Sequence, residues 1–445
     1  MNAAPRFGYF RCFTPRLLSV FCVVFLFITA LLGLRMHLKP FFTAALTGLP
    51  LLAQAAPASS SSDSSEDGRF TSYTISAEGI TVKAIPYGAR LTSVLVNDRH
   101  GHVQDVLTGY DDPIEYLHDT ETNHTYFGAT VGRYANRIKN GTFSIDGNTY
   151  HIPENEHDGE DTLHGGFVGY DARNWTVGPH TDSSITFSLL DEGFQNFPGD
   201  VITTVTFTVD NEVTAENPKG LPQLTSRIVS EALTKKTPIM LANHLYWNLN
   251  AFKKQNVLKD TTLQMPLSTR YIGADGIEVP TGEIFEVSNT YGGALDFTQP
   301  KLIGKDIEKT ENLCGTGCTG YDTCWITDRD PGYSAPNSMV SSITMASDTT
   351  GISLDVITNQ AALQIYTCNS QNGSIKTKKS QQERNQKQDG SPGAEYVEQY
   401  GCVVIETEDW IDGINQPEWG RDAYQIVGPA DPPLVNWAVY QFGNC

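Results

Sequence analysis

Basic residues are scarce in this chain of 445 residues. Lysine and arginine together number 31 against 51 aspartates and glutamates, and the formal net charge is −20 at pH 7. An acidic surface of this kind repels phosphate backbones and anionic lipids. The composition therefore argues against a nucleic-acid partner and, less strongly, against a phosphorylated sugar as substrate.

Residue spacings typical of metal sites are missing. The sequence contains no Cys-x-x-Cys pair and no His-Glu-x-x-His pattern, which are common signatures of zinc sites. We therefore expect no bound metal. A metal hydrolase with His164, His244 and Glu406 as ligands remains an alternative, although these residues lack the expected spacing.

Hydrophobic runs with helical spacing are also scarce, whereas aromatic, β-branched and glycine residues are plentiful. In the segment 201–209 the valines and Phe207 fall on one face and the threonines mostly on the other, as in a half-buried strand. Similar patterns occur at 80–96, 185–190, 352–358 and 402–406. The chain shows no internal repeat and no second domain boundary. We therefore expect residues 70–445 to form one all-β domain, a largely antiparallel sandwich.

The first 55 residues have the pattern of an export leader. An apolar run at 17–34 follows three arginines and is long enough to span a membrane. Met36 then begins a second pattern, in which an apolar stretch at 41–52 precedes Ala53-Gln54-Ala55, a small-residue cleavage site. We interpret Met36 as the true start of a signal peptide and expect a secreted protein. The alternative is a retained anchor at 17–34, and only this alternative predicts a membrane partner.

The remaining chain agrees with export. It carries glycosylation sequons at Asn123, Asn140, Asn174 and Asn372. An even number of cysteines suggests disulfides, with fifteen possible connectivities; these are Cys314, Cys318, Cys324, Cys368, Cys402 and Cys445. Residues 56–69 read as a serine-rich linker, and the polar tract 374–394 reads as a solvated loop insertion because it has almost no apolar residues.

Five short segments combine charged, amide and imidazole groups with glycine and aromatics: 132–138, 163–166, 243–249, 320–322 and 405–415. Each has an ordinary explanation by itself. His164 could cap a turn, His244 could be a satisfied histidine in a sheet, Glu406 could face solvent, and Asp322 could be a turn residue.

Together with Gln364, the same segments supply what a sugar site needs. Asn136, Arg137, Asp322 and Gln364 can bind hydroxyl groups, and Tyr246 and Trp247 can cover the C–H face of a sugar ring. Opening a hemiacetal requires one group that removes the anomeric hydroxyl proton and one that protonates the ring oxygen. A carboxylate and an imidazole are a natural pair for this at neutral pH.

The segments and their order resemble the aldose 1-epimerase (galactose mutarotase) family, from about Tyr73 to about Gln441. The motifs that carry the resemblance are Gly-Arg-x-Ala-Asn-Arg-Ile at 132–138, Leu-His-Gly-Gly at 163–166 followed by Gly169-Tyr170-Asp171 and Trp175, the acidic aromatic stretch 191–199, Thr237-Pro238 before Asn-His-x-Tyr at 243–246, Gly-Tyr-Asp at 320–322 and Gln-x-Tyr-Thr at 364–367. The chain departs from the family pattern Glu-Thr-Gln-x-x-Pro-Asp, because Glu408 stands for the glutamine and Ile411 for the proline. Trp247 stands where phenylalanine is common.

The resemblance implies a galactose mutarotase-like β-supersandwich and an aldose 1-epimerase that interconverts the anomers of free hexoses such as glucose and galactose without a cofactor. It assigns Glu406 as the catalytic base and His244 as the general acid. It also implies that His164 contacts and polarises the sugar. The other substrate-binding positions are Asn136, Arg137, Asp322 and Gln364.

A proton exchange of this kind leads to a further expectation. Burial beside Glu406 should raise the pKa of His244 and keep it a proton donor. Two other functions remain open: a hexose-6-phosphate 1-epimerase, which would need more basic residues at the site, and a non-catalytic secreted sugar-binding protein.

Overall fold

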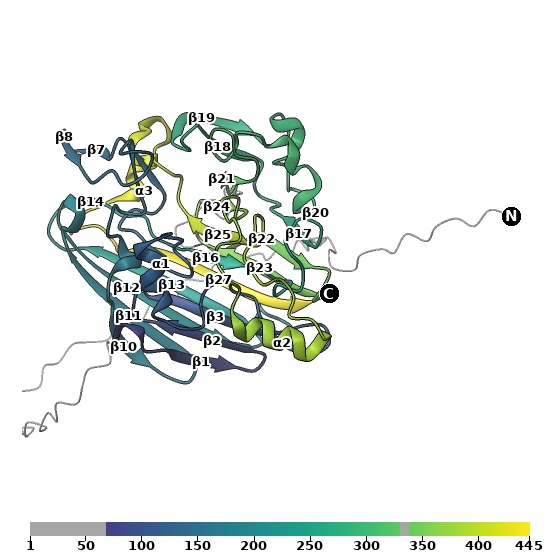
Figure 1. Ribbon diagram of the computed structural model, residues 1–445. Helices are drawn as coiled ribbons and strands as arrows, with labels where there is room; N and C mark the ends of the chain where they lie inside the picture. The colour runs from purple at the N-terminus through teal and green to yellow at the C-terminus, as the bar shows by residue number, and fades with distance from the viewer. Residues whose placement is uncertain (1–67, 330–337) are drawn as a thin grey trace, which may run out of the picture. The chain divides into compact units, whose positions relative to one another are not determined.

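The structure is a computed structural model that describes residues 68–329 and 338–445 (Figure 1). The predicted leader at 1–55, its alternative anchor at 17–34 and nearly all of the predicted linker 56–69 lie outside the described residues. Within the described ranges, no helix has both the length and the apolar character needed to cross a membrane.

The largest sheet has nine strands, and Figure 1 shows its long strands side by side. In sheet order these are β10 (Thr176–His180), β11 (Ser184–Glu192), β12 (Asp200–Asp210), β13 (Gln223–Ala232), β27 (Leu434–Asn444), β23 (Ile352–Thr358), β22 (Val340–Ser347), β17 (Thr261–Gln264) and β20 (Lys301–Leu302). Every pairing is antiparallel. Strand β12 alternates strictly between buried and half-buried side chains, which confirms the pattern predicted for 201–209.

A second sheet of six strands carries most of the residues discussed below. Its order is β16 (Leu245–Trp247), β25 (Val403–Glu408), β24 (Ala362–Tyr366), β21 (Asp322–Ile326), β18 (Arg270–Ala274) and β19 (Pro280–Glu286). A third sheet has four strands, β1 (Tyr73–Ala77), β2 (Ile80–Ile85), β3 (Arg90–Asn97) and β4 (Val103–Asp105). The predicted all-β, largely antiparallel architecture is confirmed.

The described residues also form four short two-stranded ladders. They are β5 (Thr130–Val131) with β15 (Ala242–Asn243), β6 (Arg137–Lys139) with β9 (Asp161–Leu163), β7 (Thr142–Ile145) with β8 (Asn148–His151), and β14 (Thr237–Pro238) with β26 (Ile426–Val427). The first two ladders bring segments far apart in sequence next to the six-stranded sheet. In β6 and β9, Arg137 is paired with Leu163, so the 132–138 and 163–166 motifs lie side by side.

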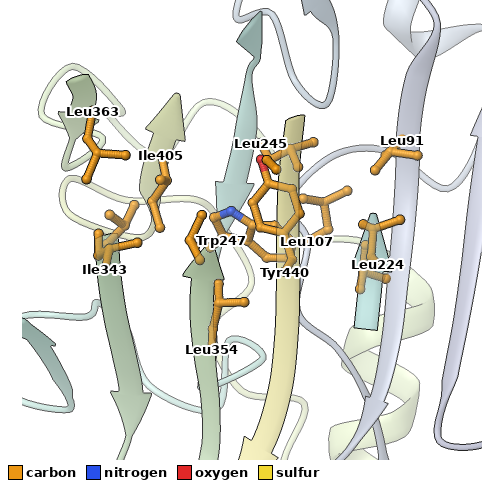
Figure 2. Close-up of a cluster of buried hydrophobic side chains, with 14 of the residues drawn as sticks. Leu91, Leu107, Leu224, Leu245, Trp247, Ile343, Leu354, Leu363, Ile405 and Tyr440 are labelled. Atoms are coloured by element: carbon orange, nitrogen blue, oxygen red, sulfur yellow. The ribbon is translucent and has the colours of Figure 1, made fainter. Parts of the chain in front are cut away.

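The inward faces of all three sheets contribute to one continuous core. Figure 2 shows Leu363 and Ile405 of the six-stranded sheet near Ile343 and Leu354 of the nine-stranded sheet. Trp247 packs on Tyr440 with ring centroids 5.3 Å apart. Truncating one of these aliphatic side chains to alanine would cost about 2–5 kcal/mol of stability.

The prediction of a solvated loop at 374–394 is wrong for much of its length. Residues Lys379–Asp389 form helix α2, and its Gln381 and Asn385 are buried. Gln381 donates to the carbonyls of Asp105 and Leu107, and Asn385 donates to the carbonyl of Ala251. The helix is held by hydrogen bonds from amide side chains to main-chain oxygens, which a search for apolar periodicity cannot detect. The other α-helices among the described residues are α1 (Glu115–Glu121) and α3 (Asp422–Gln425).

Candidate functional site

A cavity of about 760 Å³ opens over one face of the six-stranded sheet. Its lining contains every residue that the sequence assigned to catalysis or substrate binding: Asn136, Arg137, His164, His244, Asp322, Gln364 and Glu406. A larger cavity of about 970 Å³ around Trp410 and Arg421 contains none of them. We place the candidate site in the smaller cavity because polar groups from distant segments converge there.

Strand alternation explains which side chains reach this cavity. In β25, Glu406 and Glu408 point to one face and Thr407 to the other. Glu406 is paired with Gln364 of β24, and Asp322 of β21 is paired with Tyr366, so their side chains share that face. The same alternation corrects one expectation. Tyr246 lines the cavity, whereas Trp247 turns to the opposite face, is fully buried in the core and does not line the site.

His244 and Glu406 form the centre of the site. The distance between His244 Nε2 and Glu406 Oε1 is 3.5 Å, and both side chains are buried. The remaining polar atoms, Nδ1 of His244 and Oε2 of Glu406, have no hydrogen-bond partner among the described residues. Both groups therefore keep bonding capacity, which is unusual for buried polar atoms and common at functional sites.

The electrostatics of this pair differ from the expectation. Burial lowers the pKa of His244 to about 3. Burial and the nearby Glu408 raise the pKa of Glu406 well above its ordinary value. The predicted rise in the pKa of His244 is therefore wrong. Loss of hydration dominates, and a protonated Glu406 has no charge with which to stabilise an imidazolium.

His164 lies beside His244, with ring centroids 5.2 Å apart. The main-chain N–H of Asn136 donates to Nδ1 of His164 at 3.0 Å. Burial, together with nearby His244 and Arg137, lowers the pKa of His164 well below its ordinary value. The neutral ring therefore has its proton on Nε2, which makes His164 a hydrogen-bond donor rather than a base.

The contact between Asn136 and His164 depends on close approach of the 132–138 and 163–166 motifs. A Cβ atom on Gly165 would lie 2.2 Å from the carbonyl oxygen of Gly132, so only glycine fits at this position. His164 and Asn136 both have left-handed backbone conformations, with φ of 50° and 59°. Strained backbone of this kind persists where surrounding contacts fix it and is frequent at functional sites.

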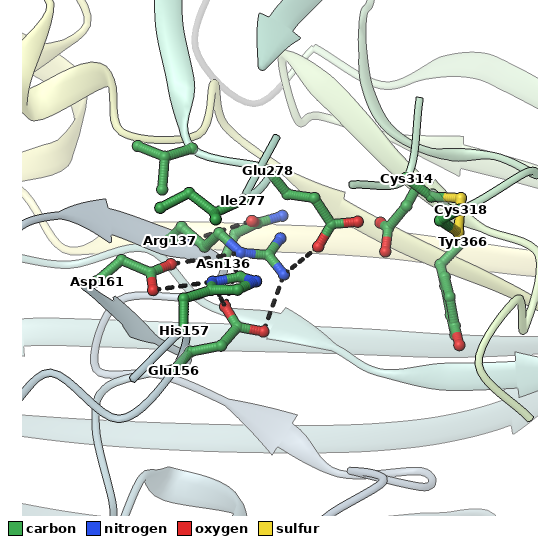
Figure 3. A network of polar contacts seen from close by, with 12 residues as sticks. Asn136, Arg137, Glu156, His157, Asp161, Ile277, Glu278, Cys314, Cys318 and Tyr366 are labelled. Carbon is green, nitrogen blue, oxygen red and sulfur yellow. Dashed lines mark hydrogen bonds and ion pairs between the residues drawn. A yellow bond between two sulfur atoms is a disulfide. The ribbon is translucent and has the colours of Figure 1, made fainter. Parts of the chain in front are cut away.

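Arg137 is enclosed by carboxylates (Figure 3). It donates to both oxygens of Glu156, from Nε at 2.7 Å and from Nη2 at 3.0 Å, and Nη2 also donates to Glu278 at 2.5 Å. Asp161 lies 3.5 Å from Nε. Nη1 has no hydrogen bond within the described residues, so only this group remains to bind a substrate. Glu156, Asp161 and Glu278 carried no sequence signal, because they come from separate segments outside the recognised motifs.

Asp322 and Gln364 form a second pair on the sheet, in which Nε2 of Gln364 donates to Oδ1 of Asp322 at 2.5 Å. Burial and repulsion from Glu278 raise the pKa of Asp322 well above its ordinary value. Aromatic rings complete the inner wall. Tyr126, which the sequence did not single out, contacts the rings of both His164 and His244, with centroids 4.7 and 5.7 Å away.

The rim of the cavity is braced by covalent links. Disulfides join Cys314 to Cys318 and Cys368 to Cys402, and Figure 3 shows the first of them near Tyr366. Cys314 and Cys318 themselves line the cavity. Cys324 is a buried free thiol.

Within residues 68–329 and 338–445, two groups of side chains have donor atoms close enough to hold a cation. Those of His164, His244 and Glu406 lie within 4.8 Å of one another, as do those of Glu156, His157 and Glu278. In the second group, the Arg137 guanidinium already contacts both glutamates. In the first group, Nδ1 of His164 already accepts a hydrogen bond. His244 and Glu406 of the same group have the geometry of a general acid and a general base.

Comparisons with known proteins agree on one family. The aldose 1-epimerase family model matches residues 71–426. A probable aldose 1-epimerase of Arthroderma benhamiae is 55% identical over 376 residues, which cover 83% of this chain and 86% of the relative. The galactose mutarotase of Sus scrofa is 30% identical over 357 residues, which cover 79% and 89%.

Comparison with solved structures points to the same family. The solved structure of a GalM/aldose epimerase homologue from C. elegans has a TM-score of 0.67 and 25% identity, and the match covers 84% of this chain and 99% of that one. The expected galactose mutarotase-like β-supersandwich is thereby confirmed. The chain belongs to the aldose 1-epimerase family.

Proposed function

We propose that this protein is an aldose 1-epimerase that interconverts the α and β anomers of free hexoses, with glucose and galactose as its first candidates. The observation that carries the proposal is the buried His244–Glu406 pair. Its two groups are 3.5 Å apart and line the cavity, and each has a polar atom without a partner among the described residues. A non-catalytic binding site would have no use for unpaired acid and base groups of this kind.

The pair exchanges protons with the sugar. Glu406, as a carboxylate, takes the proton of the anomeric hydroxyl, and His244, as an imidazolium, gives a proton to the ring oxygen. The bond between the anomeric carbon and the ring oxygen breaks, and the anomeric oxygen becomes the carbonyl of the open-chain aldehyde. Rotation about the adjacent carbon–carbon bond exposes the other face, and closure with the two transfers reversed forms the other anomer.

Burial fits this cycle. His244 and Glu406 together hold one proton. When the proton is on His244 both groups are charged, and when it is on Glu406 both groups are neutral. Burial favours the neutral form, because it raises the pKa of Glu406 and lowers that of His244. Ring opening converts the charged form into the neutral one, so burial of the pair supports the open-chain complex. The N–H of His164 and Nη1 of Arg137 are the donors that can stabilise negative charge in the charged complex.

Charge around the cavity supports a free sugar over a sugar phosphate. Among the described residues that line the cavity, Arg137 is the only lysine or arginine, and Glu156, Glu278 and Asp161 already surround it. A phosphate group placed there would meet carboxylates before it met an unpaired cation. The alternative of a hexose-6-phosphate 1-epimerase is therefore disfavoured.

Secretion and glycosylation are part of the proposal. The disulfides Cys314–Cys318 and Cys368–Cys402 are typical of an oxidising compartment, and the sequon residues Asn123, Asn140, Asn174 and Asn372 are all exposed. Mass spectrometry of the protein from a culture medium would test this. N-glycans and an N-terminus near Ala56 are expected. A membrane fraction that keeps residues 17–34 would favour the anchor instead.

Polarimetry tests the activity directly. Freshly dissolved α-glucose and α-galactose, with glucose 6-phosphate as comparison, should reach the anomeric equilibrium faster in the presence of the enzyme. The spontaneous rate is subtracted from each. Acceleration with the phosphate alone would assign the alternative activity. Tight binding of a hexose without acceleration would identify a binding protein.

A further inference from the structure

Glu408 is a buried acid that the proposed proton exchange does not use. It follows Glu406 by two residues on the same face of β25, where the family pattern has glutamine, and its exposed fraction is 0%. None of the ion pairs among the described residues includes it. Fully buried glutamates almost always have a charged partner, so this one requires an explanation.

The contacts of Glu408 lead to the sugar-binding residues. Its Oε1 accepts a hydrogen bond from the side-chain amide of Asn136 at 3.0 Å, and its Oε2 has no partner among the described residues. Asn136 in turn accepts from the main-chain N–H of Arg137 and donates its own main-chain N–H to Nδ1 of His164. Glu408 therefore anchors the residue that sets the tautomer of His164.

The charges around Glu408 are mostly acidic. The charged and titratable groups that act on it, or that it acts on, are Glu406, Asp409, Asp322, Arg137, Cys324 and Tyr134, and Ala362 is its partner across the sheet. Burial is the main cause that raises the pKa of Glu408, to about 8, while the hydrogen bond from Asn136 opposes the rise. Below that pH the side chain is uncharged.

We propose that Glu408 is a positioning residue of the sugar site and that it works as an uncharged carboxylic acid. In this form Oε1 accepts from Asn136 as the oxygen of a glutamine amide would, and no second negative charge stands beside Glu406. Loss of the proton places a carboxylate next to Glu406 and disfavours the ionised form of Glu406 that acts as base. The kinetic part of this inference rests on the proposed function.

The kinetic test compares Glu408→Gln and Glu408→Ala over pH 5 to 9. The glutamine variant should keep kcat/KM within about twofold of wild type at pH 6, because its amide oxygen preserves the hydrogen bond. The alanine variant should fall by more than tenfold at every pH. At pH 9 the wild type should keep about one-tenth of its neutral activity, given a pKa of about 8, whereas the glutamine variant should keep most of it.

Two results would overturn the proposal. A loss of more than tenfold in Glu408→Gln at pH 6 would mean that the site needs the carboxylate. An alkaline decline in Glu408→Gln that coincides with that of the wild type would mean that Glu408 does not ionise in this range.

Thermal unfolding provides a readout that does not depend on activity. The pKa of Glu408 is higher in the folded protein, about 8, than in an unfolded chain, about 4.3. The folded state therefore binds this proton more tightly, and the resulting stability is lost as the pH rises toward 8. The Tm of Glu408→Gln minus that of the wild type should grow from pH 5 to pH 8. A constant difference would overturn the proposal.

Glu418→Gln is the matched control, because it makes the same glutamate-to-glutamine substitution at an exposed position. Its Tm difference from the wild type should stay flat over this range. If the wild type shows no mutarotase activity, the proposed function fails, while the thermal comparison still decides the protonation state of Glu408.

Discussion

Arg137 and the His244–Glu406 pair lie in one cavity but are bonded in opposite ways. Two of the three guanidinium nitrogens of Arg137 are occupied by carboxylates. The pair has a single contact of 3.5 Å and an unpaired polar atom on each side chain. In the network around Arg137 most hydrogen-bonding positions are filled, whereas the pair is a set of buried groups with open positions.

The difference separates positioning from chemistry. A network with most positions filled fixes geometry and has little capacity to exchange protons, because most changes break an existing bond. An unsaturated buried pair is unfavourable for stability, but it can bind a ligand and transfer protons. Substitutions in the two regions should therefore differ in kind, with losses of turnover at the pair and losses of stability at the network.

The largest effect is expected at the pair. Glu406→Gln keeps the shape but cannot accept the proton, and His244→Asn removes the donor. Each variant should lose about a hundred- to ten-thousandfold in kcat, the usual contribution of a positioned acid or base. The double variant should lose less than the product of the two, because both groups act in one exchange. Polarimetry corrected for spontaneous mutarotation measures this. Near-normal rates in a folded Glu406→Gln protein would refute the assignment.

Substitutions in the network around Arg137 should mainly lower the stability of the protein. Arg137→Met leaves Glu156, Glu278 and Asp161 without their shared cation and should lower the free energy of unfolding by about 3 kcal/mol, as for other buried ion pairs. Arg270→Met is the matched control, because Arg270 also binds one carboxylate, Asp328, through two nitrogens, but its side chain is 42% exposed. The control should lose under about 1 kcal/mol. Urea unfolding compares the two, and equal losses would contradict the distinction.

Asp322 lies between these extremes, since it bonds to Gln364 and lines the cavity. Asp322→Ala should reduce kcat/KM by the equivalent of about 1–3 kcal/mol, because it leaves buried partners and a sugar hydroxyl unpaired. Asp322→Asn should lose less, since the amide keeps one acceptor. Kinetics on several hexoses would measure both variants. Unchanged values on every sugar would show that Asp322 is a structural residue.

The smallest effect concerns the acid side of the pH profile. The form of the pair with one proton is the active one, and a second proton enters at His244 only as the pH falls toward its pKa of about 3. The kcat/KM of the wild type should therefore be nearly constant from about pH 5 down to pH 4. A decline centred near pH 6.5, the ordinary value for histidine, would mean that the imidazole is hydrated and that burial does not lower its pKa.

The sequence predicts the parts of this molecule in which residue types follow a periodic pattern or a recognisable motif. Alternation in 201–209 identified β12, and short motifs identified seven of the residues that line the cavity. It could not place Glu156 and Glu278 around Arg137, because their convergence depends on loops with no periodic signal. It also misjudged His244, whose pKa depends on how completely the fold removes water from the pair. Tyr246 and Trp247 show a third limit, because both are aromatic and only the strand register decides which one faces the sugar.

Helix α2 has a consequence for the dynamics of the protein. Its buried side chains are amides bound to main-chain oxygens, so its release would expose little apolar surface. The denaturant dependence and the heat capacity of an opening both scale with the surface exposed. Amide protons of α2 should therefore exchange with deuterium through local openings that are almost insensitive to low concentrations of urea. Those of β12 and β13 should exchange only through global unfolding, with a steep dependence on urea.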